Sequence, residues 1–168
     1  PDGTRFLLSY QGQQAAVDLP LLGDYNVQNA LGAAAACLSL GWALDDVAAL
    51  LSSVPQVPGR LEKIHTGNYT VLRDYAHTPD ALERVLQTLT EIVAGRIIVV
   101  CGAGGDRDKG KRPEMGEIAQ RLADVAIVTS DNPRSESPEV IIDDIVAGMR
   151  AGEYARIVNR REAIGEGL

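Results

Sequence analysis

The sequence predicts an α/β protein whose second part carries a doubly wound, mostly parallel sheet. Three observations support this class. Strand-like apolar runs alternate with helix-like segments from about residue 60 onward. Two of these runs, residues 96–101 and 125–130, are rich in apolar and β-branched residues, which is typical of strands covered on both faces. A succession of such units also predicts right-handed crossovers between neighbouring strands.

The first part of the chain is expected to hold a strand pair and two helices. Residues 5–10 and 13–20 flank a Gln-Gly turn, which predicts a β-hairpin. Residues 26–42 place apolar side chains at helical spacing, and Gly41 favours a helix C-terminus there. A second, shorter helix is predicted to follow, with Asp45 as its N-cap.

The stretch VPQVPG at residues 54–59 breaks both patterns with two prolines and a glycine. We therefore place a domain boundary there, with residues 1–58 in a first domain and residues 59–168 in a second. In the second domain the predicted strands cover residues 69–74, 96–101, 125–130 and 155–158, and the predicted helices cover residues 78–93, 112–123 and 137–149.

The composition argues against several classes of function. The 168 residues are 45% hydrophobic and carry a net charge of −7, which argues against nucleic acid or an anionic membrane as a partner. No apolar run reaches the length that spans a bilayer, and Cys37 and Cys101 lack the spacing of metal ligands. We expect a cytoplasmic protein with no metal site in this chain. Because the chain opens with Pro1, we expect it to be a segment of a longer protein.

Unusual polar residues follow the first three predicted strands of the second domain. Asp74 and His77 follow the first of these strands, Arg107 follows the second, and Asn132 and Arg134 follow the third. The carboxyl ends of parallel strands meet at one edge of a sheet, where ligands bind in open α/β folds. We therefore expect these five side chains to line one crevice.

The loop after the second strand formally matches a phosphate-binding P-loop from Gly105 to Lys111. We reject that interpretation, because Arg112 stands where a Ser or Thr hydroxyl would bind Mg²⁺. The loop is instead locally positive, which favours an anionic or zwitterionic ligand. A solvated loop with internal ion pairs is the alternative.

The loop after the third strand, TSDNPRSESP at residues 129–138, also allows two interpretations. Asn132 precedes a proline and is held out of the α region, and Arg134 offers a planar guanidinium suited to a carboxylate. Alternatively, Asp131 or Asn132 closes a turn through its own side chain and Arg134 lies in solvent. His77 is similarly either a contact to ligand or a structural residue, and Arg60 either touches ligand or holds the hinge.

Five motifs follow one another along the chain: GDYNVQNALGAAAA (23–36), PGRLE (58–62), DYAHTPDAL (74–82), GGDRDKGKRPEMG (104–116) and TSDNPRSESP (129–138). In this order they resemble the Mur ligases, and within them the UDP-N-acetylmuramoyl-tripeptide synthetases. The resemblance implies a Rossmann-like C-terminal domain, preceded by the end of a central ATP-binding domain. It also implies an ATP-dependent ligase that adds the third amino acid of the peptidoglycan stem peptide to a UDP-muramoyl dipeptide, through an acyl phosphate.

The resemblance implies a nucleotide-binding role for one set of residues. Asn29 and Asn26 match asparagines that approach the adenine, and Arg60 matches an inter-domain arginine near the nucleotide. Asp74 matches the carboxylate on the ATP ribose, with His77 beside it.

A second set matches the amino-acid pocket: Arg107, Asp131, Asn132 and Arg134. In the family the sequence D-N-P-R is the signature for meso-diaminopimelate, whereas lysine-adding relatives differ at the arginine. The chemistry agrees, because diaminopimelate differs from lysine by one carboxylate, and an arginine left unpaired would penalise the ligand that lacks it.

The chain lacks other parts that the family requires. It contains no P-loop, no candidate for the modified lysine and no UDP-binding domain. The resemblance implies that ATP and Mg²⁺ are bound mainly by those parts, so we expect the isolated segment to be inactive. A lysine-adding Mur ligase and a non-catalytic amino-acid-binding module are the alternatives.

Overall fold

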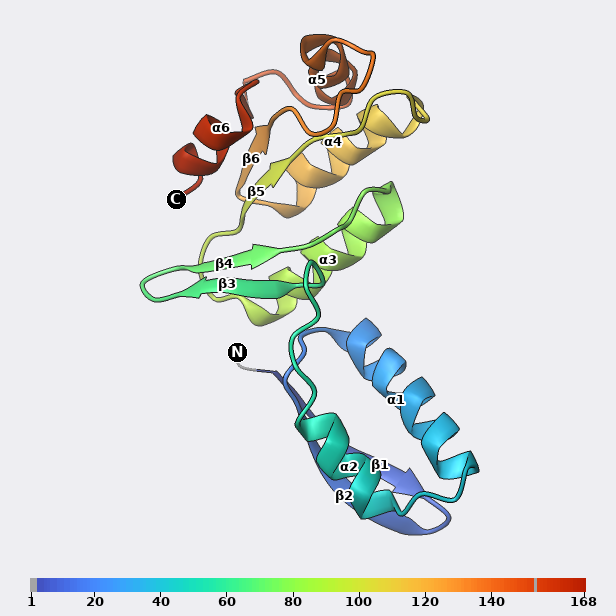
Figure 1. The fold of residues 1–168 in the computed structure, drawn as a ribbon. Coiled ribbons are helices and arrows are strands. Elements are labelled where there is room, and N and C mark those ends of the chain that lie inside the picture. The colour runs from blue at the N-terminus through green and yellow to red at the C-terminus, as the bar shows by residue number, and fades with distance from the viewer. Residues whose placement is uncertain (1–2, 153) are drawn as a thin grey trace. The chain divides into compact units, whose positions relative to one another are not determined.

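The computed structural model describes residues 3–152 and 154–168 (Figure 1). The chain divides into two compact units, of which the first ends at Tyr75 and the second begins at Ala76. The domain boundary that we predicted after residue 58 stays a prediction. None of the helices in the described part of the chain is long and apolar enough to cross a membrane.

The first unit begins with the predicted hairpin. Strands β1 (Thr4–Tyr10) and β2 (Gln13–Leu19) are antiparallel, and their register pairs Tyr10 with Gln13. Gln11 and Gly12 form the turn, both with positive φ, at 48° and 82°. Such two-residue turns match the right-handed twist of the strands they join, so the local sequence favours this hairpin.

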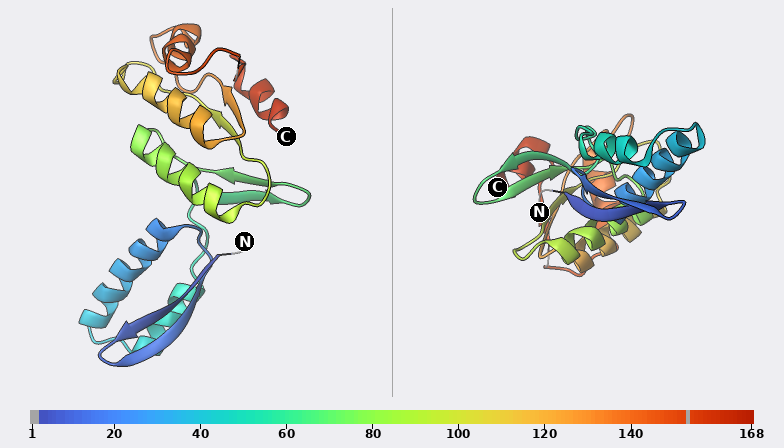
Figure 2. Two further views of the ribbon diagram at one scale, coloured as in Figure 1. Left: turned by 180° about the vertical axis from the view of Figure 1, so that it is seen from behind. Right: turned by 90° about the horizontal axis from the view of Figure 1, so that it is seen from below.

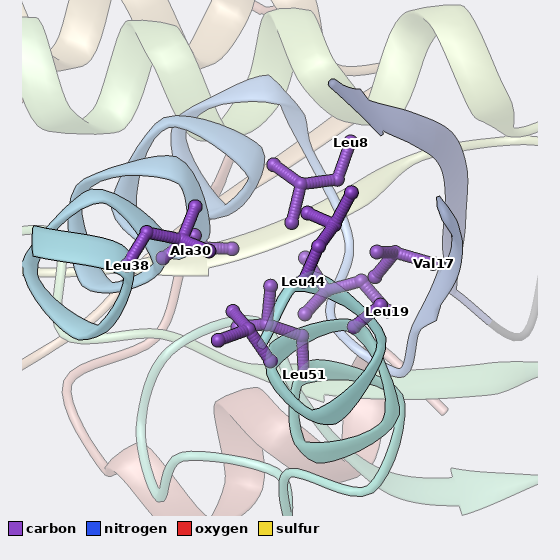
Figure 3. Close-up of a cluster of buried hydrophobic side chains, with 10 residues drawn as sticks. Leu8, Val17, Leu19, Ala30, Leu38, Leu44 and Leu51 are labelled. Atoms are coloured by element: carbon purple, nitrogen blue, oxygen red, sulfur yellow. The ribbon is translucent and has the colours of Figure 1, made fainter. Parts of the chain in front are cut away.

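Two helices cover the apolar face of this hairpin, α1 (Asp24–Ser39) and α2 (Leu44–Ser52). Gly41 has a φ of 87° directly after α1, which confirms that it ends the helix. The predicted N-cap of α2 is wrong: Ala43 occupies the N-cap, and Asp45 lies in the first turn, where its carboxylate interacts favourably with the helix dipole. Figure 3 shows how side chains from both helices and both strands form one buried cluster, which includes Leu8, Val17, Leu19, Ala30, Leu38, Leu44 and Leu51.

A second hairpin closes the first unit. Strands β3 (Glu62–Thr66) and β4 (Thr70–Arg73) are antiparallel. We predicted that the strand at residues 69–74 belongs to the parallel sheet, and this is wrong within the described residues, where β4 pairs with β3 alone. Only residues 67–69 separate the two strands. Such a short link joins antiparallel strands, whereas a parallel crossover needs a dozen residues or more.

The second unit has the predicted α/β order: α3 (Pro79–Ile92), β5 (Ile98–Cys101), α4 (Lys111–Leu122), β6 (Val125–Val128), α5 (Pro138–Val146), β7 (Ala155–Arg156) and α6 (Arg160–Glu166). The three strands form one parallel sheet in the order β5-β6-β7, which confirms the predicted sheet type. Thr78 caps α3 by accepting a hydrogen bond from the Ala81 amide, and Pro79 is the first helical residue, as predicted.

Helices cover both faces of this sheet. Ala126 of β6 packs with α3 and α4, which lie side by side in Figure 2, and Val128 packs with α5. On the other face, Gly167 after α6 lies against Val100 and Ile127. Helices thus pack on both faces, and ligands in such folds bind at the loops that follow the carboxyl ends of the strands.

Candidate functional site

Two loops lie together at the carboxyl ends of β5 and β6. We call them the first rim loop, residues 102–110, and the second rim loop, residues 129–137. Their backbones are joined by a 2.9 Å hydrogen bond from the Thr129 amide to the Cys101 carbonyl and a 2.8 Å bond from the Gly105 amide to the Asn132 carbonyl. A Cβ on Gly105 would overlap the Pro133 carbonyl oxygen, so this close approach requires a glycine.

The four residues predicted to bind an amino acid all lie on these two loops and are exposed: Arg107, Asp131, Asn132 and Arg134. No described residue hydrogen-bonds the side chains of Arg107, Asp131 or Asn132. Arg134 donates from Nη1 to the Gly105 carbonyl, which places its guanidinium on the first rim loop. Each of these side chains therefore keeps polar groups that can meet a ligand.

Glu136 and Arg112 form the principal ion pair beneath the loops. The Arg112 side chain is 0% exposed, and its two Nη atoms donate to the two Glu136 carboxylate oxygens at 3.0 and 2.8 Å. The Arg112 guanidinium, the Asp106 amide and Lys109 together hold the pKa of Glu136 well below its ordinary value. The carboxylate is therefore charged throughout the neutral range.

This network bears on the two interpretations of the locally positive stretch, an anion site or a loop with internal ion pairs. Arg112 is buried and paired, and Lys109 lies 3.0 Å from Glu136, so the alternative of internal ion pairs holds for these two cations. Lys111 donates to the His77 carbonyl at 2.6 Å. Arg107 is the cation of this loop that no described residue neutralises, which narrows the predicted anion site to Arg107 and Arg134.

Sequence reasoning missed Glu136 and Arg160 as neighbours of the site. Arg160 follows β7 and donates to the Ser130 carbonyl at 3.2 Å, so a third strand end reaches the same edge of the sheet. The available signal was the position of Arg160 just after the predicted strand 155–158. The sequence carries little sign of the role of Glu136, because Glu136 lies in the predicted loop 129–138 and its partner Arg112 begins a predicted helix far from it in sequence.

In the first unit, Arg60 and Asp74 lie at the base of the second hairpin. The Leu61 amide donates to Asp74 Oδ2 at 2.8 Å, and the Arg60 guanidinium lies 5.4 Å from the centre of the Tyr75 ring. Tyr25 lies in the electrostatic field of both charges. Burial, and then the Asp74 carboxylate, raise the pKa of Tyr25 to about 12, while Arg60 opposes the shift.

The two asparagines of α1 differ in their surroundings. Asn26 is buried and its Nδ2 donates to the Leu22 carbonyl at 2.8 Å, so it stabilises the first turn of the helix. Asn29 is exposed and lies one turn after Tyr25, on the same face of α1. The face of α1 that carries Asn29 therefore also carries Tyr25, whose pKa is shifted by the charges of Asp74 and Arg60.

His77 belongs to the second unit, whereas Asp74 belongs to the first. The crevice predicted to contain both, together with the rim residues, therefore stays a prediction.

Two surface hollows of the second unit lie away from the rim loops. They are lined by residues such as Thr90, Ile97, Asp124 and Tyr154, at the amino ends of the strands. They are open and shallow, and they contain none of the predicted site residues. Among the described residues, no group of three or more His, Cys, Asp and Glu side chains could hold a metal ion.

Residues 59–168 match the family model described as "Mur ligase, glutamate ligase domain". The chain belongs to the Mur ligase family. It is 50% identical over 169 residues to UDP-N-acetylmuramoyl-L-alanyl-D-glutamate--2,6-diaminopimelate ligase 1 of Clostridium acetobutylicum, which covers 99% of this chain and 35% of that protein. This is the family that the five sequence motifs resemble.

Solved structures agree with this assignment. A 2,6-diaminopimelate ligase structure is 42% identical, with a TM-score of 0.66, and the match covers 97% of this chain and 34% of that one. Folylpolyglutamate synthase of Mycobacterium tuberculosis, complexed with ADP and AMPPCP, gives a TM-score of 0.78 at 26% identity, over 99% of this chain and 38% of that one. The chain spans about a third of the length of the curated relatives that it matches.

Proposed function

We propose that this chain forms the amino-acid pocket, and part of the nucleotide site, of an ATP-dependent ligase that adds meso-diaminopimelate to UDP-N-acetylmuramoyl-L-Ala-D-Glu in peptidoglycan synthesis. The observation that carries the proposal is the rim: Arg107, Asn132 and Arg134 are exposed together on two loops whose backbones are hydrogen-bonded. The Clostridium acetobutylicum relative is named as a ligase of UDP-N-acetylmuramoyl-L-alanyl-D-glutamate and 2,6-diaminopimelate.

The reaction assigns a clear task to the rim. ATP phosphorylates the D-glutamate carboxylate, and the amine of the incoming amino acid attacks the acyl phosphate. The rim must therefore hold an amino acid by its charged groups and leave one amine free. Arg107 and Arg134 supply cations for carboxylates, and Asp131 supplies an anion for an ammonium group.

Specificity then follows from the number of carboxylates. Meso-diaminopimelate has two, whereas lysine has one. Arg134 already donates one bond to the Gly105 carbonyl, and its remaining nitrogens have no described partner, so they are the donors for a second carboxylate. Lysine would leave these donors unpaired, which disfavours its binding.

The nucleotide is assigned to a separate set of residues: Asn26, Asn29, Arg60, Asp74 and His77. Support comes from the electrostatic coupling of Tyr25 on α1 to Asp74 and Arg60, which links residues of three of the matching motifs. Folylpolyglutamate synthase, with a similar fold, was solved with ADP. In this proposal Mg²⁺ and the phosphates of ATP are held mainly by segments outside this chain, and the reaction takes place in the cytoplasm.

The test is calorimetric titration of the chain with meso-diaminopimelate and with L-lysine. We expect selective binding of meso-diaminopimelate, and we expect Arg134→Ala to weaken it roughly tenfold to 100-fold, since hydrogen bonds to charged groups contribute about 1.5–3 kcal/mol. Lysine binding should change little. Arg84→Ala, which removes an exposed arginine of α3, is the matched control.

The alternatives give different results. Equal losses for the two ligands in Arg134→Ala would refute the role of Arg134 in specificity. A preference for lysine would indicate a lysine-adding ligase. If neither ligand binds, the pocket needs parts of the ligase outside this chain, and the proposal that this chain alone forms it is wrong.

A further inference from the structure

Glu136 lies at the junction of the two rim loops. Its Oε1 accepts hydrogen bonds from the Asp106 amide at 2.6 Å and from Arg112 Nη2 at 2.8 Å. Its Oε2 accepts from Arg112 Nη1 at 3.0 Å and lies 3.0 Å from Lys109 Nζ. One carboxylate of the second rim loop thus holds the backbone and a cation of the first rim loop, as well as a cation of α4.

A reciprocal contact lies directly beside it. The Asp106 carboxylate accepts hydrogen bonds from the Ser135 hydroxyl at 2.6 Å and from the Ser135 amide at 3.2 Å. Asp106 precedes Arg107, and Ser135 follows Arg134. The two sets of bonds therefore join the immediate chain neighbours of the two cations that the amino-acid pocket requires.

The buried guanidinium of Arg112 forms the base of this junction. Arg112 is 0% exposed, and a buried charge must stay paired, because an unpaired one is costly. Arg112 also bonds Asp144 of α5 at 2.8 Å and the Gly104 carbonyl at 3.2 Å. Glu136 is thus held on an arginine that is itself anchored between α4 and α5.

The backbone around the junction shows that these contacts impose a conformation. Asp106 and Arg134 have φ values of 53° and 50°, in the left-handed region that side chains other than glycine disfavour. Residues keep such a conformation where surrounding contacts hold them. Without the Glu136 and Ser135 bonds, both loops would be free to relax, and the separation of Arg107 and Arg134 would change.

We propose that Glu136 is a positioning residue for the amino-acid pocket, which sets the separation of Arg107 and Arg134 by holding the second rim loop on Arg112 and Asp106. This inference rests on the proposed function for the identity of the ligand. The contacts of Glu136 distinguish this positioning role from a purely structural one. Glu136 belongs to the second rim loop and bonds the first, whereas Asp144, the other acidic partner of Arg112, lies in α5 and bonds neither loop.

Asp144 therefore supplies the matched control. Glu136→Gln keeps the size of the side chain but turns one acceptor oxygen into a donor, so it breaks bonds to Arg112 and to Asp106 or Lys109. Asp144→Asn removes a negative charge that pairs with the same arginine, and it leaves the contacts between the loops intact. Ser135→Ala removes only the exposed bond to Asp106, and it carries the test if Glu136→Gln does not fold.

Two measurements on the full chain separate the roles. Amide hydrogen exchange, followed by NMR, reports the rim through the amides of Gly105, Asp106 and Ser135. Calorimetry with meso-diaminopimelate reports the pocket. We expect Glu136→Gln to exchange these amides at least about tenfold faster, because local opening becomes easier. We expect its affinity to fall at least about tenfold, since losing one hydrogen bond to a charged group costs about 1.5–3 kcal/mol.

Asp144→Asn should leave both readouts within about twofold of the wild type. An equal loss in Glu136→Gln and Asp144→Asn would overturn the proposal, and so would unchanged exchange at the rim in Glu136→Gln. If the wild-type chain binds no meso-diaminopimelate, that result counts against the proposed pocket. The exchange comparison then still decides whether Glu136 positions the loops.

Discussion

The packing of α4 against α5 offers a sharp test of the fold that supports the rim. A Cβ added at Gly116 of α4 would overlap the Ile145 carbonyl oxygen at a distance well inside 3.0 Å, which real Cβ atoms do not show. It would also lie 3.0 Å from Met149 Cγ. The Ile145 carbonyl accepts the Gly148 amide at 3.2 Å, so it cannot move away without cost.

Gly116→Ala sets two effects against each other. Alanine gains about 1 kcal/mol over glycine in a helix interior, whereas overpacking costs about 1–3 kcal/mol. The difference is a net loss of about 0–2 kcal/mol in the free energy of unfolding. Because the clash is with backbone and not with a flexible side chain, we expect a loss in the upper half of this range. Gly165→Ala in α6, where nothing lies within 4 Å of the added Cβ, is the matched control and should lose nothing.

Urea unfolding followed by far-ultraviolet circular dichroism measures these free energies. Trp42 fluorescence identifies the transition of the first unit, since Trp42 is the single tryptophan. Gly148→Ala meets the Pro113 carbonyl oxygen in the same interface. The double variant should therefore cost less than the sum of the two, because the helices separate only once. A Gly116→Ala variant at least as stable as the wild type would refute the close approach of the two helices.

Three further predictions address other parts of the chain. Leu19→Ala, in the cluster of Figure 3, should lower the stability of the first unit by about 2–5 kcal/mol, measured by Trp42 fluorescence in urea. Glu136 has a folded-state pKa below its unfolded value, so its stabilisation is present above the unfolded pKa near 4.5 and is lost as the pH falls; Glu136→Gln should flatten the acid limb of a stability–pH curve. Tyr25 has a folded pKa raised to about 12, so stability should fall above pH about 10, where the unfolded tyrosine ionises; an ultraviolet titration of Tyr25→Phe should lack the component near 12.

Local patterns predicted most of the elements correctly, because their causes are local. The Gln-Gly turn between alternating strands, Gly41 after α1 and the Thr78-Pro79 start of α3 each act within a few residues. The pairing of β4 could not be found in this way. Thr70–Arg73 is strand-like in isolation, and its partner is set by the short link to β3 rather than by its own residues.

The same distinction explains the site. Arg107, Asn132 and Arg134 could be placed together because the residues after parallel strands gather at one edge of the sheet. Asp131 and the amino-acid-binding role of all four residues came from the family resemblance, and that role stays a prediction. The burial of Arg112 could not be read from the sequence. In sequence it belongs to a run of charges, and such a run is more often solvated than buried.

The buried Arg112 explains why the two charged residues of the second rim loop, Arg134 and Glu136, have different roles. Arg134 and Glu136 are two residues apart and of opposite charge, yet they do different work: the arginine faces outward on the rim, and the carboxylate turns inward to Arg112. An acidic chain with a net charge of −7 can present cations to an anionic ligand only if nearby carboxylates are kept from neutralising them. The structure meets this condition for Glu136, whose negative charge is paired with Arg112 and Lys109. The ion pairs beneath the rim therefore keep the Glu136 carboxylate from pairing with Arg107 or Arg134, which leaves these two arginines available to a ligand.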